Sequence, residues 1–520
     1  MRARVRTWGL AAALLGIIAV LDVANLGHLS ITYDEPRHFL YGQHILKGDS
    51  SRFDDSKMPV SALNALPGRL VPSLDTVEAG RYVTVLFSLL VALLVFTWAR
   101  QLYGDTAGLL ALTLYTFDPN LLAHAQLVTT DIFALGTITC ALFAFWRYLH
   151  SGNWRTTLVA GLALGVAQVA KYTALALFPL FVVIALLFHA RDIRREVRAY
   201  GRGALWGRAL RFMGPALVMV AVSLLVINVA FLFNRTGMPL GDYVFRSATF
   251  TSLQASSGVL GILPLPLPHP YLEGLDWIIQ RERTGEGYGH IYLLGTLRAG
   301  EGFPGYYLVA SMFKVPLGTL LLLAAAIAAW VARVRRGEDV RNDWVLVVPA
   351  SFYVVYFNFF YRAQIGFRYY LVVFPLLYVL TGGLLREGQG RPRGRMRVLS
   401  VALASVVLSV LSWYPHFLPY FNELIGNRRL SYRVLADSNI DWGQHRWYLK
   451  QYMASHPGAI IEPDGPTAGT ILVGVNALTG VAGDPGKFKW LRDNFTPVDD
   501  IAHSVLVYRV SPQDLERLGR

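Results

Sequence analysis

The chain has 520 residues, of which 54% are hydrophobic and only 16% are charged, a balance that excludes an ordinary soluble enzyme of this length. The formal net charge is +14, but the basic residues stand in short clusters between apolar runs and not on one folded basic face, which argues against a nucleic-acid-binding protein. A single cysteine, Cys140, excludes an internal disulfide and a cysteine pair for zinc or redox chemistry.

The N-terminus places arginines at positions 2, 4 and 6 ahead of an apolar run from Trp8 to Leu21. This layout is typical of a secretory signal peptide or of a first spanning helix. The run continues weakly to Leu26, and no small-residue cleavage site precedes Asp34. We therefore favour an uncleaved helix.

A spanning helix needs about 20 mostly apolar residues, and about eleven such segments follow one another along the chain. They are residues 8–27, 81–99, 106–122, 131–149, 155–170, 172–189, 212–233, 306–332, 344–361, 368–385 and 398–414. The third segment is interrupted by Asp118-Pro119, and only Lys171 separates the fifth from the sixth. The sequence therefore predicts an all-α polytopic membrane domain over residues 1–415.

The orientation of this domain follows from its short basic loops, which should stay in the cytoplasm. Arginines cluster at 191–211, 333–341 and 386–397, and these clusters fall on the side of the N-terminus when the helices are threaded in order. The prediction is a cytoplasmic N-terminus and an extracytoplasmic C-terminus. Two long loops, 28–80 and 234–305, then lie on the outer side.

The remaining residues, 416–520, are expected to form a small extracytoplasmic α/β domain. A polar-aromatic helix is predicted near 443–454, and short β-rich runs stand at 470–475 and 504–510.

Two adjacent carboxylates, Asp34 and Glu35, follow the first helix on the outer side. A carboxylate held in a partly dry site has its pKa raised toward working pH and can act as a general base. The alternative is a helix start with Asp34 as N-cap, Glu35 near the positive end of the dipole and Pro36 in the first turn, and both interpretations can hold together. Asp131, at the outer end of the fourth helix, would complete a polar cavity with Asp34, and its alternative is again an N-cap.

Three cations, Lys171, Arg362 and Arg368, stand in or beside apolar helices, where a charge is costly and usually paired or functional. A phosphate would neutralise them, and arginine offers a two-pronged match to phosphate oxygens. The alternative for each is that the long side chain reaches the headgroups, which is strongest for Arg362 and weakest for Lys171.

His290 and Tyr292 belong to a glycine- and aromatic-rich outer loop that could contact a sugar. No HExxH or Cys/His spacing indicates zinc, and a divalent cation held by Asp34, Glu35 and His38 has only proximity in its favour. No dinucleotide fingerprint or Walker lysine motif is present, so nucleotide-driven chemistry has no visible site.

These residues together resemble the GT-C membrane glycosyltransferases, in particular glycosyltransferase family 39, the protein O-mannosyltransferase type, and its bacterial relative the lipid A aminoarabinose transferase. The stretches that carry the likeness are Tyr33-Asp34-Glu35, Thr129-Thr130-Asp131, Ala170-Lys171-Tyr172, His290 to Gly295 with Gly305-Tyr306-Tyr307 and Lys314-Val315-Pro316, and Arg368-Tyr369-Tyr370. Tyr420-Phe421-Asn422-Glu423 and the run from Asp437 to Gln444 also look like bacterial members of this group.

The resemblance implies a GT-C fold, a polyprenyl-phosphate sugar donor, inversion at the anomeric carbon and an acidic base in the first outer loop. That base would be Asp34, with Glu35 and Asp131 shaping the acceptor site, while Lys171 and Arg368 would bind the departing phosphate. It also implies a bacterial plasma membrane. The chain lacks the large lectin-like insert of the eukaryotic enzymes, so the acceptor stays open between a lipid, a glycan and a protein.

Two other classes compete with a transferase. A secondary transporter would also carry charges at membrane depth, but it commonly shows paired repeats and a site near the midplane, and no internal repeat is visible here. A non-enzymatic assembly subunit would tolerate substitution of Asp34.

Overall fold

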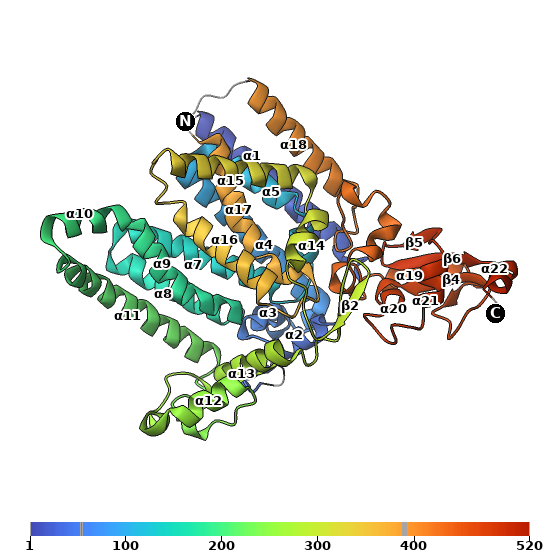
Figure 1. The fold of residues 1–520 in the computed structure, drawn as a ribbon, viewed down its shortest axis with the longest axis horizontal. Coiled ribbons are helices and arrows are strands. Elements are labelled where there is room, and N and C mark those ends of the chain that lie inside the picture. Colours follow the sequence, from blue (N-terminus) through green and yellow to red (C-terminus); the bar gives the residue numbers. More distant parts are fainter. Residues whose placement is uncertain (1, 53, 55, 387–392, 519–520) are drawn as a thin grey trace.

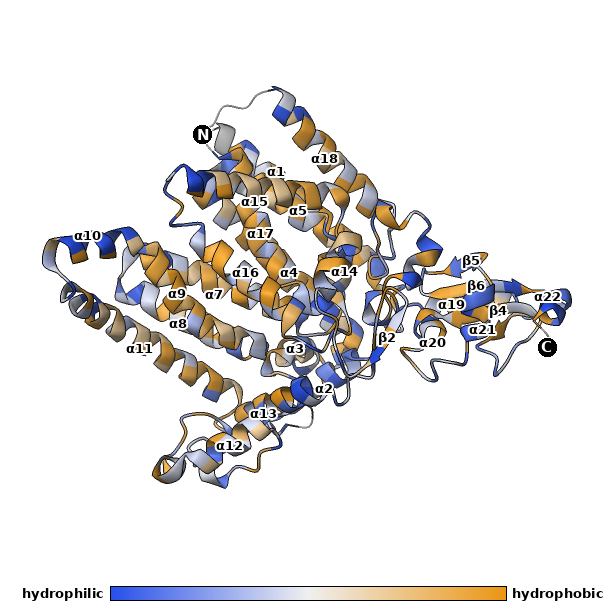
Figure 2. Ribbon diagram, viewed as in Figure 1, coloured by the Kyte–Doolittle hydropathy of each residue, from blue (hydrophilic) through white to orange (hydrophobic). Residues whose placement is uncertain are grey.

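The computed structural model describes residues 2–52, 54, 56–386 and 393–518. A helical bundle carries a small unit with a β-sheet at one end (Figure 1). Within the described residues, six helices are long and apolar enough to cross a membrane: α1 (Arg2–Leu26), α4 (Val77–Tyr103), α7 (Asp131–Ser151), α11 (Ala204–Ala230), α15 (Leu317–Arg335) and α18 (Arg393–Leu411). Figure 2 shows the hydrophobic residues gathered on these long helices.

A seventh crossing is formed if one bent pair of helices counts as a single span. The 3-10 turn η3 (Tyr172–Ala176) and α9 (Leu177–Phe188) meet α10 (Ala190–Tyr200) at 60°. Two shorter apolar helices are α16 (Trp344–Phe359) and α17 (Val373–Thr381), which η7 (Gly382–Leu385) extends. The chain is thus a mainly helical membrane protein, and eleven crossings remain a prediction.

Several of the predicted segments are helical but broken. Residues 106–122 divide into α5 (Asp105–Thr116) and α6 (Pro119–Ala125), because Asp118 caps the second helix by accepting the backbone N–H groups of Asn120 and Leu121 at 2.8 and 3.2 Å. Residues 155–170 form α8 (Trp154–Gln168), which ends before an extended Lys171.

The prediction of one helix over 306–332 is wrong. The structure has α14 (Tyr306–Lys314), a break at Val315-Pro316, and then α15. Proline has no N–H to donate to the preceding turn, and it drives the residue before it out of the helical region. Val315 is accordingly extended, with φ −108° and ψ 132°.

The basic clusters lie at the ends of these helices. The cluster at 191–211 is largely helical, in α10 and the start of α11, where a loop was expected. Figure 1 shows α10 and the N-terminus toward the upper left, away from the small sheet unit at the right. Arg391, counted in the third basic cluster, lies outside the described residues.

Helices α8 and α11 pack closely because two glycines on α8 face α11. A Cβ at Gly161 would stand 2.9 Å from the Cα of Met219, and one at Gly165 would stand 2.7 Å from the Cβ of Val226. Small residues four apart let two helix backbones approach within a membrane.

The outer segments are partly helical. The first, 28–80, contains α2 (Glu35–Leu46), η1 (Pro59–Ser61), α3 (Ala62–Leu70) and η2 (Pro72–Leu74). The second, 234–305, contains η4 (Leu240–Asp242), α12 (Ala248–Ser256), η5 (Gly258–Ile262), α13 (His269–Thr284) and the antiparallel hairpin β1 (His290–Leu293) and β2 (Thr296–Ala299).

The C-terminal unit has a four-stranded mixed sheet in the order β3-β4-β6-β5, with β3 parallel to β4 and the other pairs antiparallel. The predicted strands are present as β4 (Gly469–Gly474) and β6 (Val505–Val510), and the predicted helix as α19 (Arg446–Ser455). The other elements are η8 (Glu423–Ile425), η9 (Arg428–Arg433), η10 (Asp437–Asn439), β3 (Ile460–Ile461), α20 (Val475–Thr479), α21 (Lys489–Asn494), β5 (Asp499–Ile501) and α22 (Pro512–Arg517).

Candidate active site

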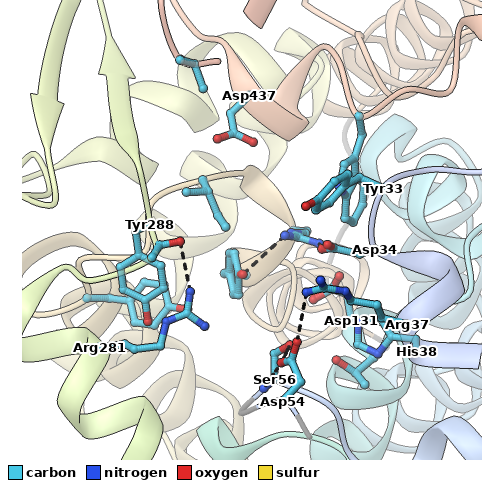
Figure 3. Close-up of a pocket in the computed structure, with 18 of the residues that line it drawn as sticks. Tyr33, Asp34, Arg37, His38, Asp54, Ser56, Asp131, Arg281, Tyr288 and Asp437 are labelled. Carbon is cyan, nitrogen blue, oxygen red and sulfur yellow. Dashed lines mark hydrogen bonds and ion pairs between the residues drawn. The ribbon is translucent and has the colours of Figure 1, made fainter. Parts of the chain in front are cut away.

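A cavity of about 1460 Å³ lies between the helical bundle and the C-terminal unit. The start of α2, η3, α13, α16 and η6 (Phe367–Tyr370) line one side of it, and residues from η10, α19 and β4 line the other. Figure 3 shows Asp34, His38 and Asp131 on one wall of this cavity and Asp437 across from them.

Asp34 and Arg368, which lie 334 residues apart in sequence, meet in the cavity. Nη1 of Arg368 donates to Oδ2 of Asp34 at 2.8 Å, and the arginine side chain is 7% exposed. Asp34 stands at the N-cap position of α2, but its side chain makes no capping hydrogen bond. The carboxylate therefore pairs with the arginine and does not cap the helix.

The arginine is held on further sides by aromatic rings. Its Cζ lies 4.0 Å from the centre of the Trp442 ring and 5.0 Å from that of Tyr369. Such contacts between a cation and a ring face are worth the most where water is excluded.

Asp131 and Lys171 form a second pair on the same wall. Nζ of Lys171 donates to Oδ1 of Asp131 at 2.6 Å, and lies 4.3 Å from the centre of the Tyr369 ring. Asp131 is the first residue of α7, and Thr130 occupies the N-cap position, so the alternative of Asp131 as the cap is wrong. Tyr369 contacts the cations of both pairs, so one aromatic ring links the two carboxylate–cation contacts.

The pKa values of the cavity residues differ with their neighbours. Burial acts to raise the pKa of Asp34, but the charges of Arg368 and Lys57 outweigh it and hold that pKa below the usual range. Across the cavity, burial raises the pKa of the Asp437 carboxyl to about 7. Burial and the charge of Lys57 keep the pKa of His38 well below its usual value, so this imidazole is neutral at working pH.

Glu35 points away from the cavity, although it follows Asp34 in sequence. Its carboxylate accepts Nε and Nη2 of Arg81 at 2.8 and 2.7 Å, and both side chains are fully buried. It also accepts the backbone N–H groups of Thr32 at 2.8 Å and of Val128 at 3.0 Å. Glu35 therefore ties the first outer loop to α4 and to the segment that leads into Asp131.

Three other predicted site residues also lie outside the cavity. None of His290, Tyr292 and Arg362 is among the described residues that line it. Tyr292 is buried on β1, and His290 is half-buried at the start of the same strand. Arg362 is exposed and donates from Nη1 to the backbone oxygen of Arg283 at 2.9 Å.

Sequence reasoning missed several residues that line the cavity. Lys57 is 3% exposed, and Arg281 and Tyr288 come from the outer segment that also carries His290. Lys57 and Tyr288 stand in loops without periodicity, and Arg281 lies near the end of α13, so no local pattern points to them. Asp437 and Trp442 had a signal, because they belong to the run from Asp437 to Gln444 that resembles bacterial glycosyltransferases.

The sequence left open a divalent cation held by Asp34, Glu35 and His38. Across residues 2–52, 54, 56–386 and 393–518, no group of three or more His, Cys, Asp or Glu side chains is arranged to hold a metal ion.

The sequence between residues 73 and 218 matches the family described as dolichyl-phosphate-mannose-protein mannosyltransferase. This segment contains Asp131 and Lys171 and excludes Asp34 and Arg368. A comparison with curated proteins finds no match.

Among solved structures, ArnT from Cupriavidus metallidurans bound to undecaprenyl phosphate has the same fold, with a TM-score of 0.50 and 16% identity, over 79% of this chain and 67% of ArnT. The oligosaccharyltransferase of Archaeoglobus fulgidus gives 0.47 and 14% identity over 78% of this chain and 55% of that one. The Pmt1-Pmt2 complex of S. cerevisiae bound to the sugar donor gives 0.34 and 18% identity over 44% of this chain and 34% of that one.

The fold is therefore that of the GT-C membrane glycosyltransferases, and residues 73–218 match a family of membrane glycosyltransferases. Within the class, its sequence relationship is to the protein mannosyltransferase type, as the resemblance predicted.

Proposed function

We propose that the chain is an inverting glycosyltransferase that moves a sugar from a polyprenyl-phosphate-linked donor to an acceptor hydroxyl on the extracytoplasmic face of the membrane. The observation that carries the proposal is the pair of carboxylate–cation contacts, Asp34 with Arg368 and Asp131 with Lys171, in one cavity. The ArnT structure, with undecaprenyl phosphate bound to the same fold, supports this choice of donor.

Arg368 and Lys171 are the cations that would bind the donor phosphate. Tyr369 lies against both, at 5.0 and 4.3 Å, and both residues line the same cavity. As the bond from the anomeric carbon to the phosphate oxygen breaks, negative charge grows on the phosphate, and fixed cations in a poorly hydrated site stabilise it better than water does.

Asp34 is the proposed general base. A donor phosphate that accepts hydrogen bonds from Arg368 competes with Asp34 for the guanidinium. The positive charge of Arg368 lowers the pKa of Asp34 in the structure, and sharing that charge with the phosphate raises this pKa again. The acceptor oxygen attacks the anomeric carbon, its proton passes to Asp34, and polyprenyl phosphate leaves from the opposite face of the sugar. A positioned base of this kind contributes roughly 10²- to 10⁴-fold to the rate.

Asp131 and Glu35 have supporting roles in this proposal. Asp131 fixes the ammonium group of Lys171 at 2.6 Å, and Glu35 holds the loop from which Asp34 projects. The orientation proposed is an N-terminus in the cytoplasm and a C-terminal unit outside the plasma membrane of a bacterium. The acceptor can be a lipid, a glycan or a protein.

The test is to incubate the purified protein with a panel of polyprenyl-phosphate sugars and to measure the release of free polyprenyl phosphate. We expect release from at least one donor, and a loss of about 10²-fold or more in Asp34→Asn with unchanged expression and membrane insertion. Asp464→Asn, at a fully exposed carboxyl far along the C-terminal unit, is the matched control. Full turnover by Asp34→Asn would refute the assigned base.

A further inference from the structure

One short run in the C-terminal unit, residues 437–444, contacts the two segments that carry Asp34 and Arg368. On the Asp34 side, the backbone N–H of Tyr33 donates to the carbonyl of Trp442 at 3.1 Å, and that of Ser30 donates to the carbonyl of Gln444 at 3.2 Å. These two bonds fix the loop that carries the carboxylate.

The same run fixes the segment that carries the arginine. The backbone N–H of Phe367 donates to Oδ1 of Asn439 at 2.9 Å, and Oγ of Ser438 donates to the carbonyl of Ile365 at 2.5 Å. Asn439 also donates to the hydroxyl of Tyr306 at 2.9 Å, which anchors the run to α14 of the helical bundle. The C-terminal unit is thus built into the cavity wall and is not an appendage.

Trp442 lies at the centre of these contacts. Its ring covers one face of the Arg368 guanidinium at 4.0 Å, while Asp34 takes one edge of the same group at 2.8 Å. The indole is itself 8% exposed and packs edge to face against His124, with ring centroids 6.0 Å apart. The ring therefore has little freedom to move away.

Arg368 also lines the cavity, and its guanidinium carries further N–H donors besides the one that bonds to Asp34. Within the described residues, Nε of Arg368 is buried without a hydrogen-bond partner, and Nη2 has only a long contact of 3.5 Å to the hydroxyl of Tyr369. Two donors on one planar group match the oxygens of a phosphate, provided that the plane is held in a fixed orientation. A long arginine side chain loses conformational entropy when it is fixed in one orientation. Because the Trp442 ring already fixes the guanidinium, less of this entropy is lost when the phosphate binds.

We propose that residues 437–444 are a structural part of the catalytic centre, and that Trp442 is the positioning residue that orients Arg368 toward the donor phosphate. This inference rests on the proposed function. It gives the C-terminal unit a direct role in donor binding, through a ring that touches the arginine and not the substrate.

The experiment compares Trp442→Leu, Trp442→Phe and Trp447→Leu in the purified full-length protein. Binding of undecaprenyl phosphate in detergent is titrated for each. We expect Trp442→Leu to bind about tenfold more weakly, and Trp442→Phe to stay within about threefold of the wild type, because phenylalanine keeps an aromatic face. Trp447 is the matched control, since it lies five residues further on, is 37% exposed and packs edge to face against His28.

Hydrogen exchange supplies a second readout that does not depend on any ligand. Trp442→Leu should speed exchange in the segments 30–38 and 365–371 and leave β4 and β6 unchanged, whereas a merely structural loss would loosen the whole sheet. Unchanged exchange in 30–38 and 365–371, or equal losses of binding in the leucine and phenylalanine variants, would overturn the positioning role. If the wild type itself does not bind undecaprenyl phosphate, the proposed donor is wrong, and the exchange data alone decide the role of Trp442.

Discussion

Two neighbouring acids, Asp34 and Glu35, have opposite surroundings. Asp34 faces a cavity and one arginine edge, while Glu35 is fully buried against Arg81 and accepts two backbone N–H groups. Consecutive residues at a helix start point in different directions, so a sequence motif of two carboxylates does not imply two carboxylates in one site.

The buried Glu35–Arg81 pair should matter for stability. Removing one partner of a buried ion pair leaves an uncompensated charge and costs about 3–5 kcal/mol. We expect Glu35→Ala to lower the melting temperature strongly in detergent and Glu35→Gln to lower it less. Asp499→Ala breaks an exposed pair with Arg429 and should change stability by at most about 1 kcal/mol. Equal melting temperatures for Glu35→Ala and Asp499→Ala would contradict this assignment.

The carboxyl of Asp437 predicts a dependence of stability on pH. Its pKa in the folded protein, about 7, lies above its ordinary value of 3.8, so the folded state holds the proton more tightly than the unfolded state does. This stabilising contribution is fully present below pH 3.8 and is lost as the pH rises through 7. Asp437→Asn keeps a neutral side chain at all pH values.

We therefore expect the melting temperature of Asp437→Asn, relative to the wild type, to increase between pH 4.5 and pH 8, with most of the change below about pH 7. Asp464→Asn, at an exposed carboxyl, should show a constant offset over the same range. A difference that shrinks as the pH rises would show that Asp437 is stabilised as its anion.

At the scale of elements, the helix breaks position the site. Lys171 sits in the extended gap between α8 and η3, and Asp131 begins α7, so each charged group stands where backbone geometry changes. Because α8 leads directly to Lys171, the packing of α8 on α11 should influence this cation.

The substitution Gly165→Leu tests that packing. A Cβ at this position would lie 2.7 Å from Val226 and 2.9 Å from Ser223, so the helices must separate, at a cost of about 1–3 kcal/mol. We expect a lower melting temperature and weaker donor use. Gly16→Leu on α1 has open space and should change neither property. Partial recovery in the double variant Gly165→Leu with Val226→Ala would support the contact, and no recovery would argue against it.

The sequence predicted a mainly helical membrane protein, because membrane helices need long apolar runs, whatever their tertiary contacts. The eleven crossings stay a prediction. It also predicted two strands of the C-terminal unit, because their β-rich composition is a local signal. The prediction of one continuous helix over 306–332 failed at Val315-Pro316. The apolar run on both sides of this proline favoured a single spanning helix, although a proline often ends one. In the site, the motifs of the resemblance identified Asp34, Arg368 and Lys171. The place of Lys57 and the packing of Trp442 on Arg368 depend on contacts between distant segments, which no local pattern encodes.

At the scale of the whole molecule, the basic clusters and the cavity should lie on opposite sides of the membrane. The cluster at 333–341 closes α15, while the C-terminal unit adjoins the cavity at the other end of the bundle (Figure 1). The single cysteine, Cys140, lies on α7, and Cys140→Ser gives a background without thiols.

In that background, Asp464→Cys should react with a membrane-impermeant maleimide in intact cells, and Arg336→Cys should react only after the membrane is opened. Both native side chains are well exposed, at 105% and 62%, so access to solvent is not limiting. Labelling of position 336 alone in intact cells would invert the orientation and place the cavity in the cytoplasm.

The sharing of Arg368 has a kinetic consequence. The guanidinium pairs with Asp34 in the structure and, in the proposed reaction, also with the donor phosphate. Binding of the phosphate is therefore thermodynamically linked to the basicity of the Asp34 carboxylate. This linkage is reciprocal. A hydroxyl that arrives early meets a carboxylate too weak to accept its proton. By the same reciprocity, the spent carrier should be held more tightly while Asp34 keeps the acceptor's proton, and loss of that proton should favour its departure.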